Sequence, residues 1–155
     1  AAEVSVKSSE GEVFAASVLA FDPIRDLALL GAPGLDVPAL APAAPMGGTD
    51  GSALVRADDA VVAIDVGITR TINIVSTDIY GDGEHRRRGL ELAADIDSGD
   101  SGGAVIDAEG NVVGIVFSAS RRQVDVAYAV SALELDALVA VATDGPVDTG
   151  DCLRP

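Results

Sequence analysis

One serine of the chain stands in a frame of glycines that suits a nucleophile. The stretch is Gly99-Asp100-Ser101-Gly102-Gly103. A hydroxyl nucleophile must project from a sharply turned backbone whose N–H groups also point at the carbonyl oxygen under attack, and glycine permits both the turn and the close approach. The spacing therefore predicts a nucleophilic role for Ser101, with a glycine-rich turn that performs no chemistry as the plain alternative.

Two other sites share this pattern of residues. The nucleophile elbow of α/β-hydrolases, G-x-S-x-G, must lead directly into a helix, whereas this segment leads into a strand, a turn and a second strand. Asp95, Asp97 and Asp100 imitate the start of a calcium loop, but an EF-hand needs Gly at the sixth position and Glu at the twelfth, where the chain has Asp100 and Ile106. We expect neither a metal nor a cofactor.

A serine nucleophile needs a base, and the only histidine of the chain is His85. It lies in the polar stretch "GDGEHRRRG" (81–89), a pattern typical of a solvated loop. The neighbouring Arg86, Arg87 and Arg88 would disfavour the imidazolium that a base must form. We therefore expect a surface histidine rather than the base of Ser101.

Short segments rich in β-branched residues predict strands along most of the chain. Residues 3–8 and 12–21 read as a hairpin, and residues 26–32 as a buried strand. Ser131 and Glu134 form an S-x-x-E capping box before an apolar run, which predicts a helix from Ser131. Further strands are expected over 53–57, 60–68, 71–80 and 89–96, on both sides of the turn at 107–111, and over 123–130. The pattern indicates an all-β barrel or sandwich with one late helix.

Length and composition limit the organisation and the partners. The 155 residues suffice for one domain or two small lobes, and a segment dense in proline and glycine, 34–52, predicts a connector between two halves. The net charge of −15 disfavours nucleic acid and anionic membrane surfaces as partners. No apolar run approaches the ~20 residues of a membrane-spanning helix, so we expect no direct membrane contact from these residues. Aromatic residues make up only 3%, so Val, Ala, Leu and Ile must form the core.

Two motifs together resemble a known family. "GDSGGAVIDAEGNVVGIVF" (99–117) resembles the nucleophile region of trypsin-like, chymotrypsin-fold serine proteases. "FDPIRDLALL" (21–30) is similar to the strand that carries the catalytic aspartate in their HtrA-like branch. Residues 77–82 and 127–139, with a cysteine near the C-terminus, resemble the membrane-anchored MarP-type proteases of actinobacteria.

The resemblance implies a chymotrypsin-like double β-barrel. Residues 1–33 would be the remainder of a first barrel that starts partway through, and residues 53–143 the second barrel and the helix. Residues 144–155 would form a C-terminal tail.

The resemblance also implies roles for individual residues. Ser101 becomes the nucleophile, and the backbone N–H groups of Gly99 and Ser101 become the oxyanion hole. Asp26 becomes the carboxylate that orients the imidazole. Asp22 competes with it, but Asp22 precedes a proline and is expected to start the turn.

Two further places would contact a peptide or protein substrate. Asp95 occupies a position that lines the specificity pocket in trypsin-like enzymes, although a carboxylate hydrogen-bonded to nearby backbone amides is an equal alternative. Phe117, Ser118 and Ala119 fall where the substrate-pairing strand of the family runs, and a peptide could add there by β-augmentation.

The histidine of this family precedes the aspartate, so the resemblance implies that the triad histidine is absent from the chain. We therefore expect a serine endopeptidase by descent that is nearly inactive as these residues alone. A peptide-binding pseudoprotease is the alternative.

Cys152 by itself is either an inert thiol or half of a bridge. The resemblance implies a disulfide to a cysteine near the missing histidine, an extracytoplasmic location and a membrane anchor before Ala1.

Overall fold

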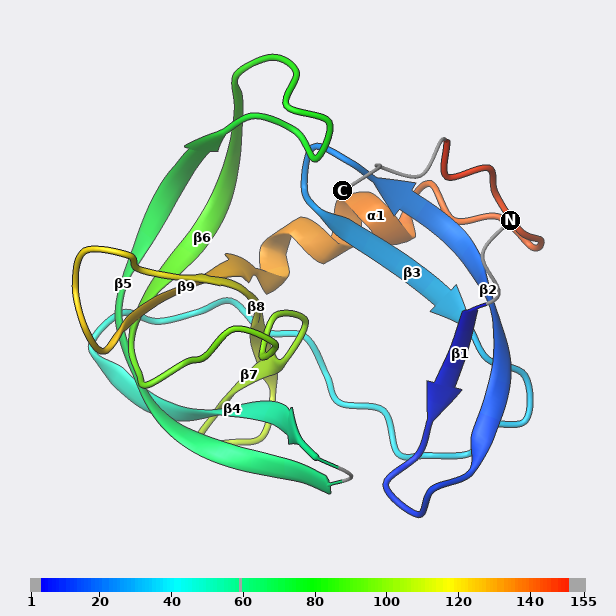
Figure 1. Cartoon of the computed structure of the whole chain (residues 1–155), viewed down its shortest axis with the longest axis horizontal. Helices are drawn as coiled ribbons and strands as arrows, with labels where there is room; N and C mark the ends of the chain where they lie inside the picture. The colour runs from blue at the N-terminus through cyan, green and yellow to red at the C-terminus, as the bar shows by residue number, and fades with distance from the viewer. Residues whose placement is uncertain (1–3, 59, 151–155) are drawn as a thin grey trace. The chain divides into compact units, whose positions relative to one another are not determined.

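The computed structural model describes residues 4–58 and 60–150, and these residues form a mostly β-structure (Figure 1). The prediction of strands followed by one late helix is confirmed. The strands are β1 (Val4–Lys7), β2 (Val13–Asp22), β3 (Leu27–Gly31), β4 (Thr49–Ala57), β5 (Ala60–Ser76), β6 (His85–Ala93), β7 (Ala104–Asp107), β8 (Val112–Ala119) and β9 (Val126–Ser131). A 3₁₀ turn, η1 (Ala132–Glu134), and a short helix, α1 (Leu135–Val139), follow.

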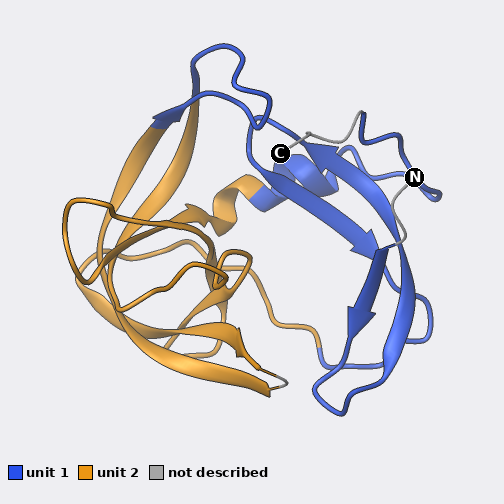
Figure 2. Ribbon diagram, in the orientation of Figure 1, with its two compact units in different colours: residues 1–38, 75–85, 135–155 blue, residues 39–74, 86–134 orange. Residues whose placement is uncertain are grey.

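The chain divides into two compact units (Figure 2). Unit 1 contains residues 1–38, 75–85 and 135–155, and unit 2 contains residues 39–74 and 86–134.

Unit 2 is a closed barrel in the strand order β4-β5-β6-β9-β8-β7. Its core contains only Val, Ala, Leu and Ile, as the shortage of aromatic residues predicts. The core residues are Ala53, Val55, Val66, Ile68, Leu90, Leu92, Ala94, Ile96, Val105, Val113, Val116, Ala127 and Ala129. A closed barrel has no free sheet edge of its own, so the strands that carry the Ser101 segment are held on both sides over most of their length.

Unit 1 is built on the antiparallel sheet β1-β2-β3. Its β2 and β3 strands pair in the register Asp22↔Leu27, which leaves four residues for the turn between them. Helix α1 packs against β2 and β3, and its Leu138 is buried. The segment after α1 is also hydrogen-bonded to β2, because Thr143 N–H donates to the Leu19 carbonyl and Val147 N–H to the Val18 carbonyl.

Two elements extend further than the sequence suggests. β5 is one continuous strand from Ala60 to Ser76, where two separate strands are expected. β6 begins at His85, so residues 85–88 are strand residues and the expectation of a polar loop there is wrong. Pairing in the sheet overrides the polar composition, because alternation buries Arg87 while Arg86 and Arg88 point outward.

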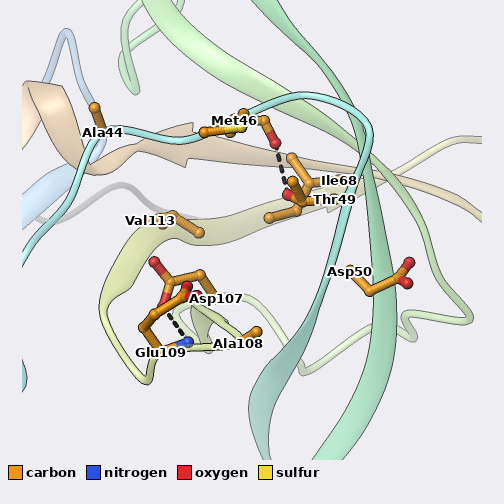
Figure 3. A pocket seen from close by; sticks show the side chains of 9 residues that line it. All are labelled: Ala44, Met46, Thr49, Asp50, Ile68, Asp107, Ala108, Glu109 and Val113. Atoms are coloured by element: carbon orange, nitrogen blue, oxygen red, sulfur yellow. Dashed lines mark hydrogen bonds between the residues drawn. The ribbon is translucent and has the colours of Figure 1, made fainter.

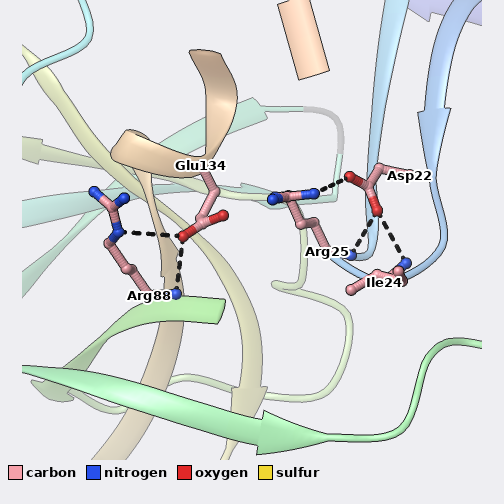
Figure 4. Close-up of polar contacts among 5 residues, drawn as sticks. All are labelled: Asp22, Ile24, Arg25, Arg88 and Glu134. Atoms are coloured by element: carbon pink, nitrogen blue, oxygen red, sulfur yellow. Dashed lines mark hydrogen bonds and ion pairs between the residues drawn. The ribbon is translucent and has the colours of Figure 1, made fainter. Parts of the chain in front are cut away.

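The predicted capping box is not formed, and the helical segment is short. Ser131 is still the last residue of β9, and its Oγ accepts a hydrogen bond from Leu133 N–H at 3.2 Å. The Glu134 carboxylate does not return to this turn. It accepts the Arg88 N–H of β6 at 3.0 Å, and it lies 3.6 Å from Arg88 Nε (Figure 4). Glu134 therefore binds Arg88 of β6 instead of capping its own turn.

Candidate active site

The segment around Ser101 is a compact turn held by its own hydrogen bonds. Asp97 N–H donates to Asp100 Oδ2 at 2.8 Å, Asp100 N–H to the Asp97 carbonyl at 3.2 Å, and Gly103 N–H to the Asp100 carbonyl at 3.0 Å. Gly99 has φ +114°, which a side chain disfavours. A Cβ on Gly103 would lie 2.8 Å from the Leu54 carbonyl oxygen of β4. The glycines are therefore required by the fold of this turn.

Ser101 is exposed at this turn and lies next to β8. Its Oγ donates to the Phe117 carbonyl at 3.3 Å. Gly102 N–H donates to the Val116 carbonyl at 2.8 Å, and Val116 N–H donates to the Gly103 carbonyl at 2.9 Å. The hydroxyl is thus presented to solvent from a backbone that two short hydrogen bonds fix to the barrel.

The backbone N–H groups of Gly99 and Ser101 are available for an incoming oxygen. Neither donates a hydrogen bond to any of the residues 4–58 and 60–150 that the structure describes. Both residues are exposed, so no desolvation cost arises from this. Two such donors beside a hydroxyl have the composition of an oxyanion hole.

The strand segment Phe117-Ser118-Ala119 has one side without a strand partner. Pairing of β8 with β7 ends at Ala104↔Ile115, whereas pairing with β9 continues to Ala119↔Ala127. A register shift between Val116 and Ser118 marks a bulge at Phe117. On the side that faces away from β9, the segment could therefore take up a peptide strand next to Ser101.

Asp95 is exposed in the segment that follows β6. Its neighbour Ala94 is buried and donates its N–H to the Asp125 carbonyl at 3.0 Å, which ties this segment to the loop between β8 and β9. Within the described part of the chain, the Asp95 carboxylate accepts no hydrogen bond. The alternative of a carboxylate bound to nearby amides is thus not realised.

Arg87 is a residue near the site that the sequence reasoning missed. It is 7% exposed, and its guanidinium carbon lies 4.6 Å from the centre of the Phe117 ring. The Phe117 ring in turn lies 6.4 Å from that of Tyr128. A cation over an aromatic face stabilises the ring's position. In a strand over "HRRRG", side chains alternate between the two faces, so Arg87 points to the opposite face from Arg86 and Arg88. This alternation was the signal in the sequence that could have identified Arg87.

The two candidate aspartates, Asp22 and Asp26, belong to unit 1 and differ in their environment. Asp22 accepts hydrogen bonds from Ile24 N–H and Arg25 N–H, both at 3.0 Å, and from Arg25 Nη1 at 2.6 Å. Burial acts to raise the pKa of Asp22, but the hydrogen bonds from Arg25 and Ile24 outweigh it and hold the pKa below the ordinary value. Asp22 therefore caps the turn, as the proline after it suggests.

Asp26 ends the same turn with its side chain exposed. Its φ is +56°, a left-handed conformation that aspartate tolerates better than most residues. Its carboxylate accepts no hydrogen bond from the described residues. Of the two carboxylates, Asp26 is the one that remains available to orient another group.

His85 is half-buried at the start of β6 and belongs to unit 1. Its Nε2 would lie 2.7 Å from a Cβ on Gly83, so the ring packs against the loop before it. Ser101 belongs to unit 2. Cys152, the candidate for a disulfide, lies outside the described residues.

Unit 2 contains a cavity whose lining includes no residue of the Ser101 turn (Figure 3). It measures about 470 Å³, and its lining consists of Ala44, Met46, Thr49, Asp50, Ile68, Asp107, Ala108, Glu109 and Val113. The Asp107 carboxylate is hydrogen-bonded within the β7–β8 turn, where it accepts Glu109 N–H at 3.0 Å and Asn111 N–H at 2.8 Å. These bonds, above all those from Asn111, hold the pKa of Asp107 below its ordinary value.

Residues 4–58 and 60–150 contain no group of three or more His, Cys, Asp or Glu that could hold a metal ion. In the same part of the chain, no helix has the length and hydrophobicity that crossing a bilayer would require.

Comparison with protein families gives a match over more than half of the chain. A family model described as the trypsin-like peptidase domain matches residues 1–115. Two curated relatives are serine proteases from strains of Mycobacterium tuberculosis, named MT3772 and Rv3671c, and each is 34% identical over 145 residues. The alignment covers 90% of this chain and 36% of each relative, so the chain spans about a third of their length.

Solved structures show the same fold. The active form of the Rv3671c protease superposes with a TM-score of 0.90 at 32% identity, over 99% of this chain and 70% of that chain. The HtrA-type protease AlgW, solved with a decapeptide, gives 0.69 at 21% identity, over 90% of this chain and 45% of that chain. The prediction of a chymotrypsin-like all-β fold is confirmed.

Proposed function

The chain belongs to the family of trypsin-like peptidase domains, and from this premise we propose that it hydrolyses peptide bonds as a serine endopeptidase domain with Ser101 as nucleophile. The observation that carries the proposal is the Ser101 turn. It exposes the hydroxyl next to two N–H groups that have no acceptor in the described residues.

The residues support an acyl-transfer mechanism. Ser101 Oγ attacks the carbonyl carbon of the scissile bond while a histidine takes its proton, and the N–H groups of Gly99 and Ser101 stabilise the oxyanion that forms. The histidine then gives its proton to the leaving amine, and water resolves the acyl-enzyme by the same steps. Asp26 holds the imidazole in the correct tautomer and stabilises its cation. The substrate lies along Phe117-Ser118-Ala119, with Asp95 facing the specificity pocket.

The histidine of this mechanism is not His85 in our proposal. His85 is followed by three arginines, which oppose a positive charge on the ring. We infer that the base comes from a part of the natural protein that these 155 residues do not include. The chain's coverage of only 36% of its curated relatives supports this. The 155 residues alone should then be nearly inactive.

Substrates and location follow from the same proposal. The substrates are peptides or proteins. Cys152 forms a disulfide with a cysteine outside these residues, in an extracytoplasmic compartment where a membrane anchor tethers the protein. The disulfide of Cys152 is tested by mass spectrometry of the natural protein after thiol alkylation. An alkylated Cys152 in protein isolated without reductant would contradict the bridge.

A peptide-binding module without catalysis is the second candidate. The observation that favours it is the single histidine of the chain. Such a module would use the free side of Phe117-Ser118-Ala119 and leave Ser101 without a base. The presence of both Ser101, in a turn suited to a nucleophile, and Asp26, in the turn between β2 and β3, favours the enzyme.

The test compares Ser101→Ala in two proteins. In the natural protein at full length we expect the change to lower kcat by ~10⁶. In the 155-residue chain it should change nothing measurable. The control is Ser98→Ala, which removes a neighbouring exposed hydroxyl and should keep the full-length activity. Full-length activity that survives Ser101→Ala excludes Ser101 as the nucleophile. Peptide cleavage by the short chain at a comparable rate excludes an external base.

A further inference from the structure

The loop between β8 and β9 carries two adjacent arginines, Arg121 and Arg122, which follow Ser120 just beyond the end of β8, the strand next to Ser101. Both side chains are exposed. Neither forms an ion pair or a side-chain hydrogen bond with any described residue. This contrasts with Arg25, Arg70 and Arg88, each of which is paired with a carboxylate. In a chain with 25 acidic and 10 basic residues, two neighbouring arginines without a carboxylate partner are unusual.

The base of this loop is fixed, so the arginines have a defined place relative to β8. Ser120 N–H donates to the Val126 carbonyl at 2.8 Å, which closes the loop. Ser120 Oγ accepts the N–H groups of Arg122 at 3.3 Å and Gln123 at 3.1 Å. Next to them, Val124 is 86% exposed. The loop thus presents two cations and one apolar side chain at the end of the free strand segment.

A peptide on this segment would pass the arginines with its amino-terminal side. Phe117 marks the end near Ser101, because its carbonyl accepts Ser101 Oγ. An antiparallel peptide has the more stable ladder, and it runs from Arg121 toward Phe117 in its own N-to-C direction. Each residue advances by about 3.3 Å in both strands. The first three residues before the scissile bond would pair with Phe117, Ser118 and Ala119, where β8 ends. The fourth and fifth residues are therefore the first to pass the loop that carries Arg121 and Arg122.

We propose that Arg121 and Arg122 select peptide substrates with Asp or Glu at the fourth or fifth residue before the scissile bond. The inference rests on the proposed function and names its substrate class. Guanidinium groups bind carboxylates with paired N–H donors. The contact is exposed, so it contributes modestly, and it weakens as salt screens the charges.

The test uses the natural protein at full length and decapeptide mixtures. Each mixture is random over uncharged residues except for one fixed position that carries Glu, Gln or Lys, and mass spectrometry identifies the bond that is cleaved. We expect Glu at the fourth or fifth residue before this bond to raise kcat/KM about fivefold over Gln in about 50 mM salt. The preference should shrink in about 500 mM salt. In the R121Q/R122Q double variant, Glu and Gln should be equivalent.

The control is Arg56→Gln, which removes the same charge from β4, where Arg56 Nε binds the Asp58 carbonyl. This variant should retain the preference for Glu. Cleavage without any acidic preference, or a preference that survives the double variant, overturns the inference and leaves the protease intact.

A binding measurement distinguishes the failure of the inference about Arg121 and Arg122 from the failure of the proposed function. The same mixtures are titrated into the chain carrying Ser101→Ala, and the amide signals of Phe117-Ser118-Ala119 are followed by NMR. Binding that favours Glu, with no cleavage by the full-length protein, supports the arginine surface and rejects the protease. No binding and no cleavage rejects both.

Discussion

The two units of the chain carry their candidate catalytic groups on different kinds of scaffold. Ser101 belongs to unit 2, a closed barrel with thirteen buried apolar residues in one cluster. Asp26 belongs to unit 1, where the three-stranded sheet is open and the buried apolar side chains of the described residues are Ala20, Leu27 and Leu138. The Ser101 turn thus rests on a barrel with a large core of its own, while the turn that carries Asp26 rests on a small core.

This difference indicates which contacts hold the turn in each unit. The Ser101 turn is bound to β8 by backbone hydrogen bonds and packs its glycine against β4. The aspartate turn depends on one side chain, Asp22, and on the Pro23 carbonyl, which accepts the Ile79 N–H at 3.1 Å. Substitutions in unit 2 should therefore lower the free energy of unfolding through lost packing, and substitutions in unit 1 through the loss of a few polar contacts.

The largest effect is expected from the barrel core. Leu92→Ala removes a fully buried side chain of β6 and should lower the free energy of unfolding by about 3 kcal/mol. Leu30→Ala on β3 is the matched control, because this leucine is 39% exposed and should cost less than about 1 kcal/mol. Urea unfolding measures both. Equal losses would show that the open sheet contributes as much packing as the barrel.

A smaller effect is expected where the 3₁₀ turn meets β6. Glu134→Ala leaves the Arg88 N–H without the carboxylate that accepts it and should cost about 2 kcal/mol, since Glu134 is nearly buried. Glu134→Gln keeps an acceptor oxygen and should lose less. Thermal unfolding of the two variants compares them. If both lose the same amount, the charge rather than the hydrogen bond holds this junction.

The smallest effect, and the one that depends on pH, is expected in unit 1. Asp22→Asn weakens the turn before Asp26 and should cost about 1 kcal/mol at neutral pH. Because folding lowers the pKa of Asp22, its stabilisation is complete above the unfolded value and is lost as the pH falls through the folded value. The difference between wild type and variant should therefore be complete above about pH 3.8 and disappear as the pH falls below the lowered pKa of Asp22 in the folded protein. A difference that persists at lower pH would assign it to packing.

Much of the candidate site could be predicted because its signals are local. The glycines around Ser101 and the strands of β2, β7 and β8 follow from backbone sterics and from the alternation of apolar residues within a few positions. The turn role of Asp22 follows from the proline after it. Each of these depends on neighbours in the sequence.

The errors concern residues whose partners are distant in the sequence. His85 lies in a strand because β6 pairs within the barrel. Glu134 does not form its predicted cap because its carboxylate accepts a hydrogen bond from Arg88, which is forty-six residues away in the sequence. The inward side chain of Arg87 and its contact with Phe117 also need the pairing of strands.

By itself, the sequence determined the family, the β-rich fold and the glycine-rich turn around Ser101, since these depend on short-range sterics and on motifs within one segment. Only the tertiary structure decided that the Asp22 carboxylate is hydrogen-bonded while that of Asp26 is available. It also decided that β8 has an unpaired side next to Ser101, followed by two arginines without a partner among the described residues. Hydrogen-bond partners and strand edges are properties of the folded barrel and sheet, because they depend on which segments lie next to one another.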